Sequence, residues 1–380
     1  MRARELGIEV GTGVPGPANA ITDVAGVRVG HATLIEGEGP LVVGQGPVRT
    51  GVTVVVPHGG NVWEEPLFAG CHRLNGNGEL TGLEWVRESG MLNSVIALTN
   101  THSVGVVHDA LIAHEVAARG GEHLFWGLPV VGETWDGKLN DINGFHVRPE
   151  HVGQALAAAS DGPVPEGSVG GGTGMICHAF KGGIGTASRV LPSDHGGFTV
   201  GVLVQANHGR RARFQVEGVP VGQVIDPDEV PPPAPPGAPS GPAAAQQGAG
   251  SIIIVVATDA PLLPNQCDRL AQRAGFGVAR TGGAGEHTSG DLFIAFATGN
   301  RGMGVGEYGA EEPLAFPLRM LSHAHVDALF YAVVEAVEEA ILNAMLQAGT
   351  MVGRDGVTAH GLDGGRLVEV MGRFGRGPLA

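Results

Sequence analysis

The sequence predicts an α/β fold in which helices cover both faces of a β-sheet. Short runs of β-branched or wholly apolar residues, flanked by turn residues, indicate strands at residues 51–57, 94–99, 198–204, 252–256 and 292–297. The runs at 252–256 and 292–297 are apolar at every position, so their strands must be buried on both sides. Segments with the 3.6-residue spacing of helices lie between such runs and supply the cover.

Four segments carry helix signals along their length or at their first residue, and a fifth, at Thr81, carries one at its start. Residues 264–278 place their apolar side chains on one face after Pro264, and residues 326–348 form a long amphipathic pattern ended by Gly349. Residues 107–119 show a similar periodicity, and Pro149 occupies a first helical position. The mixture of strands and helices along the whole chain supports the α/β class.

Two finer expectations concern helix ends and faces. Thr81 and Glu84 have the spacing of a capping box, which predicts that a helix begins at Thr81 ahead of Trp85. In the last long helix, Glu335, Glu338 and Glu339 fall on the polar face, so we expect these carboxylates to be solvated.

Composition narrows the classes of function. The net charge of −15 argues against a nucleic-acid partner, and the sequence has no basic stripe. No apolar segment approaches the roughly 20 residues of a membrane helix, and the first residues lack the apolar core of a signal peptide, so we expect no membrane partner and a cytoplasmic protein. Cys71, Cys177 and Cys267 have no metal or disulfide spacing and are expected to be reduced thiols.

Residues 227–250 read as a linker. They contain a dense proline run, PPPAPP, at residues 231–236 and continue mainly with small residues up to Gly250. Proline at this density excludes helix and central strand. The linker divides the 380 residues into a segment 1–250 and a segment 251–380, and both contain strand and helix signals. We therefore expect one α/β domain, 1–380, with a dispensable linker inside it.

The junction between Gly250 and Ser251 is the main candidate for chemistry. A serine at the start of a strand is a common boundary residue, and on local pattern alone that plain interpretation is favoured. The context supports a second interpretation, that of a self-cleavage site. Gly250 permits close approach to its carbonyl, and the preceding linker looks expendable. Attack of the Ser251 hydroxyl on that carbonyl would free a serine that carries both a nucleophile and an α-amine able to act as its base.

Two further segments could assist such a nucleophile. Ser289 and Asp291 precede an apolar strand and follow a Gly-rich loop, an arrangement that suits a relay but that also occurs in an ordinary Ser-Gly-Asp turn. Asn207 follows the strand at 198–204 and could donate its amide to an oxyanion, although an Asx turn before Gly209 is the commoner local interpretation.

Other motifs favour plain structural roles. The GGGTGM stretch that begins at Gly170 lacks the Lys-Ser/Thr ending of a phosphate-binding loop and is expected to be a turn. His323 and His325 have no cysteine or carboxylate companions, so they make a weak case for a metal site. We expect no metal and no organic cofactor.

Several motifs occur together in an order typical of one family. They are LNGNGE at residue 74, ETWDG at 133, LNDING at 139, GGGTGM at 170 and the run SIIIVVATDAPLLP that begins at Ser251. With them the chain resembles the DmpA-type aminopeptidases, which include L-aminopeptidase/D-esterases and β-peptidyl aminopeptidases. The resemblance extends from about residue 8 to about residue 362.

The resemblance implies a fold and a maturation route. The family fold is a four-layer α/β/β/α sandwich similar to that of N-terminal nucleophile hydrolases but with different strand connectivity. The precursor is cleaved between Gly250 and Ser251 into an α chain, 1–250, and a β chain, 251–380, which stay associated. Several αβ pairs are expected to assemble into a homo-oligomer.

The resemblance also assigns roles. Ser251 corresponds to the nucleophile, Ser289 and Asp291 to its relay, and Asn207 to the oxyanion donor. The family more often has Glu where this chain has Asp291. Some members carry a tyrosine where this chain has Trp135, so Trp135 is expected either to pack against a substrate side chain or to donate its one indole N–H.

These inferences predict an aminopeptidase that hydrolyses N-terminal residues from short peptides, amides or esters through an acyl-enzyme. The substrate's free α-amine needs an acidic partner, for which Glu133 is the candidate. One alternative is an acyltransferase of the ornithine acetyltransferase type, although that group uses a threonine nucleophile. A non-catalytic scaffold protein, in which the linker is only a surface loop, is another.

Overall fold

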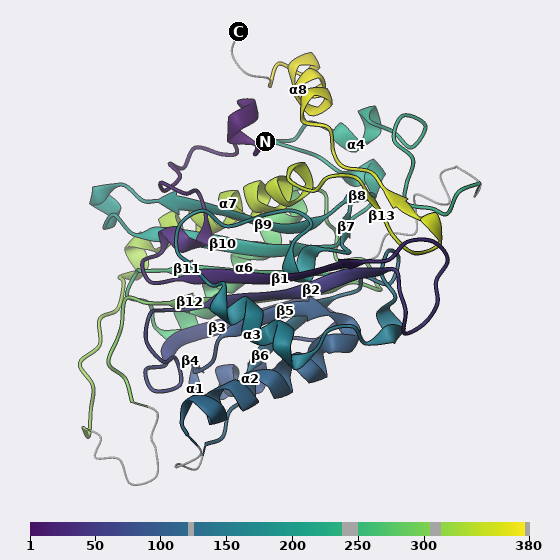
Figure 1. Cartoon of the computed structure of the whole chain (residues 1–380). Coiled ribbons are helices and arrows are strands. Elements are labelled where there is room, and N and C mark those ends of the chain that lie inside the picture. Colours follow the sequence, from purple (N-terminus) through teal and green to yellow (C-terminus); the bar gives the residue numbers. More distant parts are fainter. Residues whose placement is uncertain (121–124, 238–249, 305–312, 377–380) are drawn as a thin grey trace.

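Two stacked β-sheets with helices on both outer sides form the body of the protein. The structure is a computed structural model, and it describes residues 1–120, 125–237, 250–304 and 313–376. Figure 1 shows the sheets lying between α7 (Val326–Leu346) on one side and α2 (Val104–Ala118) with α3 (Pro149–Ala157) on the other. This arrangement is the four-layer α/β/β/α sandwich that the resemblance implies.

The larger sheet has six strands in the order β4-β3-β12-β11-β10-β9. Its central pair, β11 (Ile252–Thr258) and β12 (Gly290–Ala297), is parallel, whereas its other neighbours are antiparallel. Its outer face is covered by α6 (Pro264–Arg280) and α7. The outer strands are β3 (Leu67–Gly76), β4 (Met91–Leu92), β9 (Gly183–Val190) and β10 (Thr199–Ala206).

The smaller sheet has four strands in the order β1-β2-β5-β6. Their bounds are Arg28–Glu36, Val48–Val56, Ile96–Asn100 and Val130–Thr134. The strands β5 and β6 are parallel; α2 connects them and packs on them, while α3 packs on β1 and β2. The remaining elements are α1 (Leu83–Ser89), α4 (Val221–Val224), α8 (Gly364–Arg373), β7 (Ile176–Cys177), β8 (Phe180–Lys181), β13 (Met351–Val352) and β14 (Thr358–Ala359).

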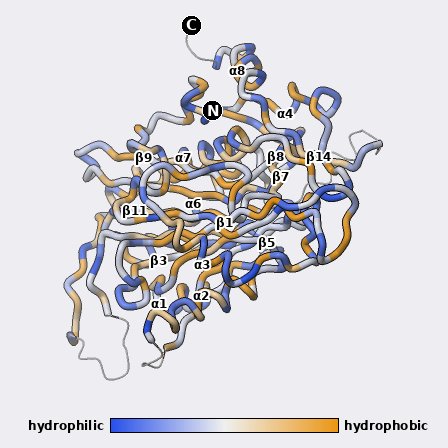
Figure 2. The backbone as a smooth tube through the Cα atoms, viewed as in Figure 1, coloured by the Kyte–Doolittle hydropathy of each residue, from blue (hydrophilic) through white to orange (hydrophobic). Residues whose placement is uncertain are grey.

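The alternation of side chains along β11 explains why every residue in it is apolar. Ile252, Ile254 and Val256 point into the core shared with α6 and α7. Ile253 and Val255 point the other way, into the core between the two sheets. Successive strand residues face opposite sides, so a strand buried on both sides needs apolar residues throughout. Figure 2 shows apolar segments running along the stacked strands in the middle of the molecule.

The segments before and after the linker share one sheet. Strand β10 precedes residues 227–250 and β11 follows them, yet the two strands pair antiparallel from Val200–Thr258 to Ala206–Ile252. Part of the linker, residues 238–249, lies outside the described residues. Strands from both segments therefore lie side by side in the six-stranded sheet.

The helix predictions need two corrections. The capping box is wrong because α1 begins at Leu83 with Gly82 at its N-cap, while the Thr81 hydroxyl donates to the Pro129 carbonyl. Glu338 and Glu339 are also not solvated: both are buried, and they pair with Arg280 and Arg189. The chain packs its N-terminal segment and β9 against that side of α7, so arginines cover the carboxylates.

Among the described residues, no helix is both long enough and apolar enough to cross a membrane. All three cysteines are free thiols, with Cys177 and Cys267 buried and Cys71 half-buried. This agrees with the sequence-based expectation that none of them forms a disulfide.

Candidate functional site

Ser251 lies immediately before β11, beside the first residues of β12. The parallel register of these strands aligns Ile252 with Asp291. This alignment places Gly290 next to Ser251, and the Gly290 N–H donates to Ser251 Oγ over 3.0 Å. Because this contact uses the oxygen of Ser251 as acceptor, the serine's own hydrogen stays available for transfer, and a donated N–H favours developing negative charge on Oγ.

Ser289 and Asp291 form a hydrogen-bonded pair at the same end of the sheet. Ser289 Oγ lies 2.6 Å from Asp291 Oδ1 and also contacts the carbonyl oxygen of Gly250. Both side chains are buried. Asp291, whose side chain is one methylene shorter than that of a glutamate, therefore reaches Ser289. Asn75 holds the pair in place, because its Oδ1 accepts the Asp291 N–H over 2.9 Å.

The environment of Asp291 favours its protonated form. Burial raises the pKa of Asp291 to about 6, and the charge of Glu286 acts in the same direction. Hydrogen bonds from Ser289 and from the Ile252 N–H oppose the shift in pKa, but burial dominates. Near pH 6 the carboxyl group can therefore either donate or accept a proton.

Asn207 stands on the other side of the Gly250–Ser251 bond, directly after β10. Its Oδ1 accepts the Ile176 N–H over 2.8 Å, so the Nδ2 group is fixed on the opposite side of the amide. One hydrogen of Nδ2 goes to the Trp135 carbonyl over 3.0 Å. The amide carries a second hydrogen, and Nδ2 lies 2.9 Å from the point where a Cβ on Gly250 would sit.

Gly250 is packed too closely against Asn207 to carry a side chain. A Cβ at this position would lie 1.6 Å from the Asn207 carbonyl oxygen. The glycine is therefore required by close backbone approach. Because Gly250 has no side chain, the two segments on either side of the linker can meet at the Gly250–Ser251 bond.

Glu133 and Trp135 approach this group from the smaller sheet, at the end of β6. Glu133 is buried; its Oε1 accepts the Glu79 N–H over 2.9 Å, and its Oε2 accepts from the Thr101 hydroxyl. Burial raises the pKa of Glu133. A Cβ on Gly78 would lie 3.1 Å from Glu133 Oε1 and 3.2 Å from Gly290 Cα, so the carboxyl group is a neighbour of the Ser251 site.

Trp135 contributes through its backbone as well as its ring. The indole is 48 % exposed and packs over Gly137, while the carbonyl of Trp135 accepts from Asn207. The sequence pattern could not indicate this backbone contact, because it depends on how β6 and β10 end relative to each other. All seven residues predicted for the site thus lie around one junction.

The model of peptidase family S58 matches residues 19–359. The chain belongs to peptidase family S58.

Known relatives and solved structures resemble this S58 chain over nearly its full length. The chain is 46 % identical over 381 residues to the β-peptidyl aminopeptidase BapA of Sphingosinicella microcystinivorans, covering 99 % of this chain and 93 % of that one. A β-aminopeptidase structure from Burkholderia sp. is similar with a TM-score of 0.90 and 53 % identity, covering 99 % of both chains. The structure of the L-aminopeptidase D-Ala-esterase/amidase of Ochrobactrum anthropi is described as a variant of the Ntn hydrolase fold. It is similar with a TM-score of 0.87 and 43 % identity, covering 99 % of both chains.

Three contributors to the candidate site were not found from the sequence. They are the Gly290 N–H, the Ile176 N–H and the Asn75 side chain. Two of them are backbone groups, which carry no residue-type signal. Asn75 lies in the LNGNGE motif, so the family pattern contained a hint of its role, but the pairing of β3 with β12 was needed to place it.

A cluster of three buried side chains near Asn207 has the residue types of a metal site. Cys177, His178 and His208 each offer a ligand atom, and these atoms lie within 4.8 Å of one another. Burial holds all three neutral: it lowers the pKa of His178 to about 4 and that of His208 well below its usual range, and it raises the pKa of Cys177 to about 12. Lys181 and Arg211 lie nearby, so their positive charges oppose a cation there.

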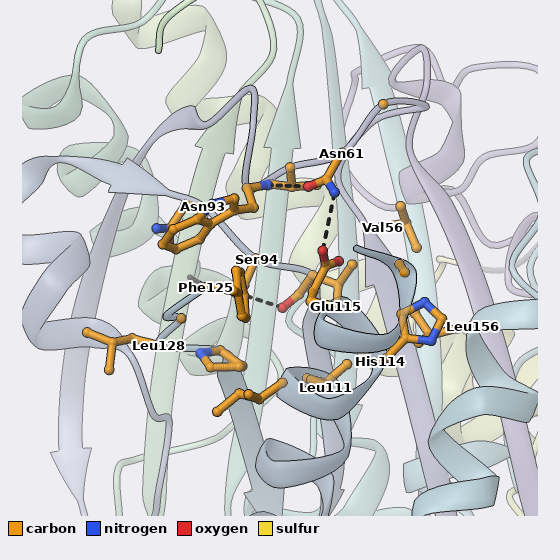
Figure 3. Close-up of a pocket in the computed structure, with 18 of the residues that line it drawn as sticks. Val56, Asn61, Asn93, Ser94, Leu111, His114, Glu115, Phe125, Leu128 and Leu156 are labelled. Atoms are coloured by element: carbon orange, nitrogen blue, oxygen red, sulfur yellow. Dashed lines mark hydrogen bonds between the residues drawn. The ribbon is translucent and has the colours of Figure 1, made fainter. Parts of the chain in front are cut away.

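A cavity of about 400 Å³ lies away from the serine, at the other end of the smaller sheet. Figure 3 shows its lining by α2 residues such as Leu111 and Glu115, with Phe125 and Leu128 on the opposite wall. Glu115 accepts from the Asn61 amide there. None of the residues predicted for the site lines this cavity.

Proposed function

We propose that this chain is a self-cleaving aminopeptidase that releases N-terminal residues from short peptides, amides and esters, with Ser251 as its nucleophile. The observation that carries the proposal is the convergence of Ser289, Asn207 and the Gly290 N–H on the Gly250–Ser251 bond. Membership in a peptidase family supports the same conclusion.

Self-cleavage would begin when Ser251 Oγ attacks the Gly250 carbonyl carbon. A C–O bond forms and the C–N bond to Ser251 breaks, while the hydroxyl proton passes to the departing nitrogen. The resulting ester joins Gly250 to the serine side chain. Water then hydrolyses the ester and leaves Ser251 as a free N-terminus on the segment 251–380.

Counting hydrogens on Ser289 suggests how the Gly250 carbonyl is activated. The hydroxyl has one hydrogen but two oxygen partners, the Gly250 carbonyl and Asp291 Oδ1. Both contacts are hydrogen bonds at once only if Asp291 is protonated and donates to Ser289, which then donates to the carbonyl. Because burial raises the pKa of Asp291 to about 6, this protonated state is well populated at and below that pH.

In the mature enzyme the same groups would serve hydrolysis. The free Ser251 amine, with a reference pKa of about 7.7, takes the hydroxyl proton directly or through Ser289. The second hydrogen of the Asn207 amide stabilises the oxyanion. Glu133 accepts the substrate's α-ammonium group, and the exposed Trp135 ring packs against the substrate side chain. Water releases the acyl group.

Denaturing gel electrophoresis and N-terminal sequencing test self-cleavage. At about 0.1 kDa per residue of this 38.8 kDa chain, the fragments are expected near 25 and 13 kDa. The smaller one should begin Ser-Ile-Ile, and Ser251→Ala should leave one intact band. An intact band in the wild-type protein would refute the proposal.

A panel of aminoacyl p-nitroanilides tests the activity and the substrate class. The names of two similar relatives, a β-peptidyl aminopeptidase and a β-aminopeptidase, favour β-aminoacyl substrates over L- and D-α-aminoacyl ones. We expect release of p-nitroaniline from β-alanyl substrates, and acetylation of the substrate amine should abolish it. Turnover that is independent of a free amine would contradict the role of Glu133.

The alternative functions are less well supported. An ornithine acetyltransferase type of enzyme uses a threonine nucleophile, and position 251 is a serine. A scaffold protein would not need a buried relay around a peptide bond. Acyl transfer to added ornithine, measured beside hydrolysis, separates the two enzymatic functions.

The mature assembly is part of the proposal. The pairing of β10 with β11 supports α and β chains that remain associated after cleavage. We further propose that αβ pairs form a homo-oligomer, which light scattering of the cleaved protein would measure. The three free thiols support the cytoplasm as its location.

A further inference from the structure

Lys181, at the end of β8, is a buried lysine whose Nζ group contacts three backbone carbonyl oxygens. Its Nζ donates to the carbonyl oxygens of Met175 over 2.9 Å and Gly182 over 2.8 Å, and lies 3.4 Å from that of Gly172. Its side chain is fully buried. Burial lowers the pKa of Lys181 to about 7. An ammonium group has three hydrogens, so three carbonyls match it in number.

One planar peptide group connects Lys181 with Asn207. The carbonyl of Met175, which accepts from Lys181, belongs to the same peptide unit as the N–H of Ile176. That N–H donates to Asn207 Oδ1 over 2.8 Å. The chain of contacts therefore runs from the buried amine through a single peptide to the side-chain amide beside Gly250.

Through this peptide, a charge on Lys181 can polarise the Asn207 amide. A positive charge at a carbonyl oxygen draws electron density from the peptide nitrogen, so the N–H becomes a stronger donor. A stronger hydrogen bond from the Ile176 N–H to Asn207 Oδ1 polarises the Asn207 amide in the same way. The Nδ2 hydrogens then become stronger donors. The bond also prevents the amide from flipping, because flipping would place two N–H groups face to face.

We propose that Lys181 is a positioning residue that orients and polarises the Asn207 amide through the Met175–Ile176 peptide. The inference rests on the proposed function, since it assumes that Asn207 stabilises the oxyanion. Lys181 touches neither the nucleophile nor the scissile bond in this structure, so its effect on turnover passes through Asn207.

The test replaces Lys181 by methionine, which has a similar length but no donor. Removing an oxyanion donor costs about 100- to 1,000-fold in kcat, so losing the support of one is expected to cost roughly tenfold, with little change in KM. Arg211→Met is the matched control. Arg211 is buried and donates to the carbonyls of His178 and Ala179, on the same loop, but not to the peptide that contacts Asn207. It should lower stability and leave kcat of the folded enzyme unchanged.

A double-mutant cycle separates positioning from a purely structural role. In an Asn207→Ala background, measured after cleavage is complete, Lys181→Met is expected to change kcat by less than about twofold, because the residue through which it acts is gone. An equal loss in both backgrounds, or an unchanged kcat in the wild-type background, overturns the inference. If Asn207→Ala alone leaves kcat unchanged, the proposed function of Asn207 fails instead.

A second measurement needs no Lys181 variant. Lys138 and Lys181 are the only lysines in the chain, so ¹⁵N-lysine labelling yields two side-chain signals, which Lys138→Arg assigns. Coupling through the peptide predicts that Asn207→Ala shifts the Lys181 Nζ signal. A Lys181 signal that is the same in both proteins overturns the inference even if Lys181→Met does not fold.

Discussion

Ser289 lies 2.6 Å from Asp291 Oδ1, and the same Ser289 hydroxyl contacts the carbonyl of Gly250. A hydroxyl group has one hydrogen, so the protonation state of Asp291 decides which of the two oxygens receives it. With Asp291 charged, the hydrogen points to the carboxylate; with Asp291 neutral, it is free for the carbonyl. This relationship links the acidity of one buried side chain to the activation of the Gly250 carbonyl.

Self-cleavage is therefore expected to be faster at low pH. Because the pKa of Asp291 is raised to about 6, the protonated form decreases as pH rises above that value, and the cleavage rate should fall about tenfold per pH unit. Gel time courses of freshly translated precursor between pH 5 and 8 measure this. In Asp291→Asn the amide can donate to Ser289 at every pH, so the rate should be flat; a wild-type rate that rises with pH would contradict the model of a protonated Asp291.

Hydrolysis by the mature enzyme should show the opposite trend. The Ser251 amine must be neutral to accept a proton, and its reference pKa is about 7.7, so kcat is expected to rise as pH increases from 6 to 8. Initial rates with a β-alanyl p-nitroanilide over this range provide the measurement. A profile that falls in this range would argue against the amine as base.

Gly250→Ala is expected to block self-cleavage. The new Cβ would lie 1.6 Å from the Asn207 carbonyl oxygen, so the bond must move away from Ser289 and Asn207. Gly153→Ala, at a helical position with open space around it, is the matched control and should be cleaved normally. Normal cleavage of Gly250→Ala would show that this packing is not needed for the reaction.

Asn207→Ala should lower kcat of the cleaved enzyme by about 100- to 1,000-fold and change KM little, because the oxyanion is stabilised only in the transition state. Asn207→Asp provides the control for volume: it keeps an acceptor for the Ile176 N–H but loses the donor. Steady-state kinetics should therefore rank both variants far below wild type. Activity of the aspartate variant near the wild-type level would exclude a donor role.

Arg189→Met is expected to destabilise the protein. The Arg189 guanidinium lies 2.8 Å from Glu339, and both side chains are almost completely buried. Without Arg189, the buried Glu339 keeps only Arg4 as a cationic partner, so the loss is expected to cost at most about 3–5 kcal/mol of unfolding free energy. Urea unfolding measures this cost. Arg373→Met removes an arginine from an exposed pair with Glu369 and should leave the urea midpoint unchanged; equal midpoints for all three proteins would contradict the expectation.

The strands that could be predicted from the sequence are those whose composition reports burial on both sides. Residues 252–256 lie in β11 and residues 292–297 in β12, because a doubly buried strand needs an apolar residue at each position. By contrast, β1 and β3 were not predicted. Each has polar or half-exposed residues on part of its length, and each is held as a strand by its pairing with a neighbour.

The burial of Glu338 and Glu339 could not be predicted for a related reason. Helical periodicity indicates which face of α7 is polar, but not what packs on that face. The partner of Glu339 is Arg189, which lies about 150 positions away in the chain. Only the folded arrangement places an arginine beside each carboxylate.

For the site, the sequence by itself determined which residue types are present at the junction: a glycine, a serine, a Ser-Gly-Asp segment and an asparagine after a strand. Each of these also had a plain local interpretation. The tertiary structure decided that they face one another, because the register of β11 with β12 and the end of β10 are set by pairing between distant segments. The backbone contacts of Gly290, Ile176 and Trp135 depend on how β12, β7 and β6 are placed in the fold, since a peptide group is the same in every residue.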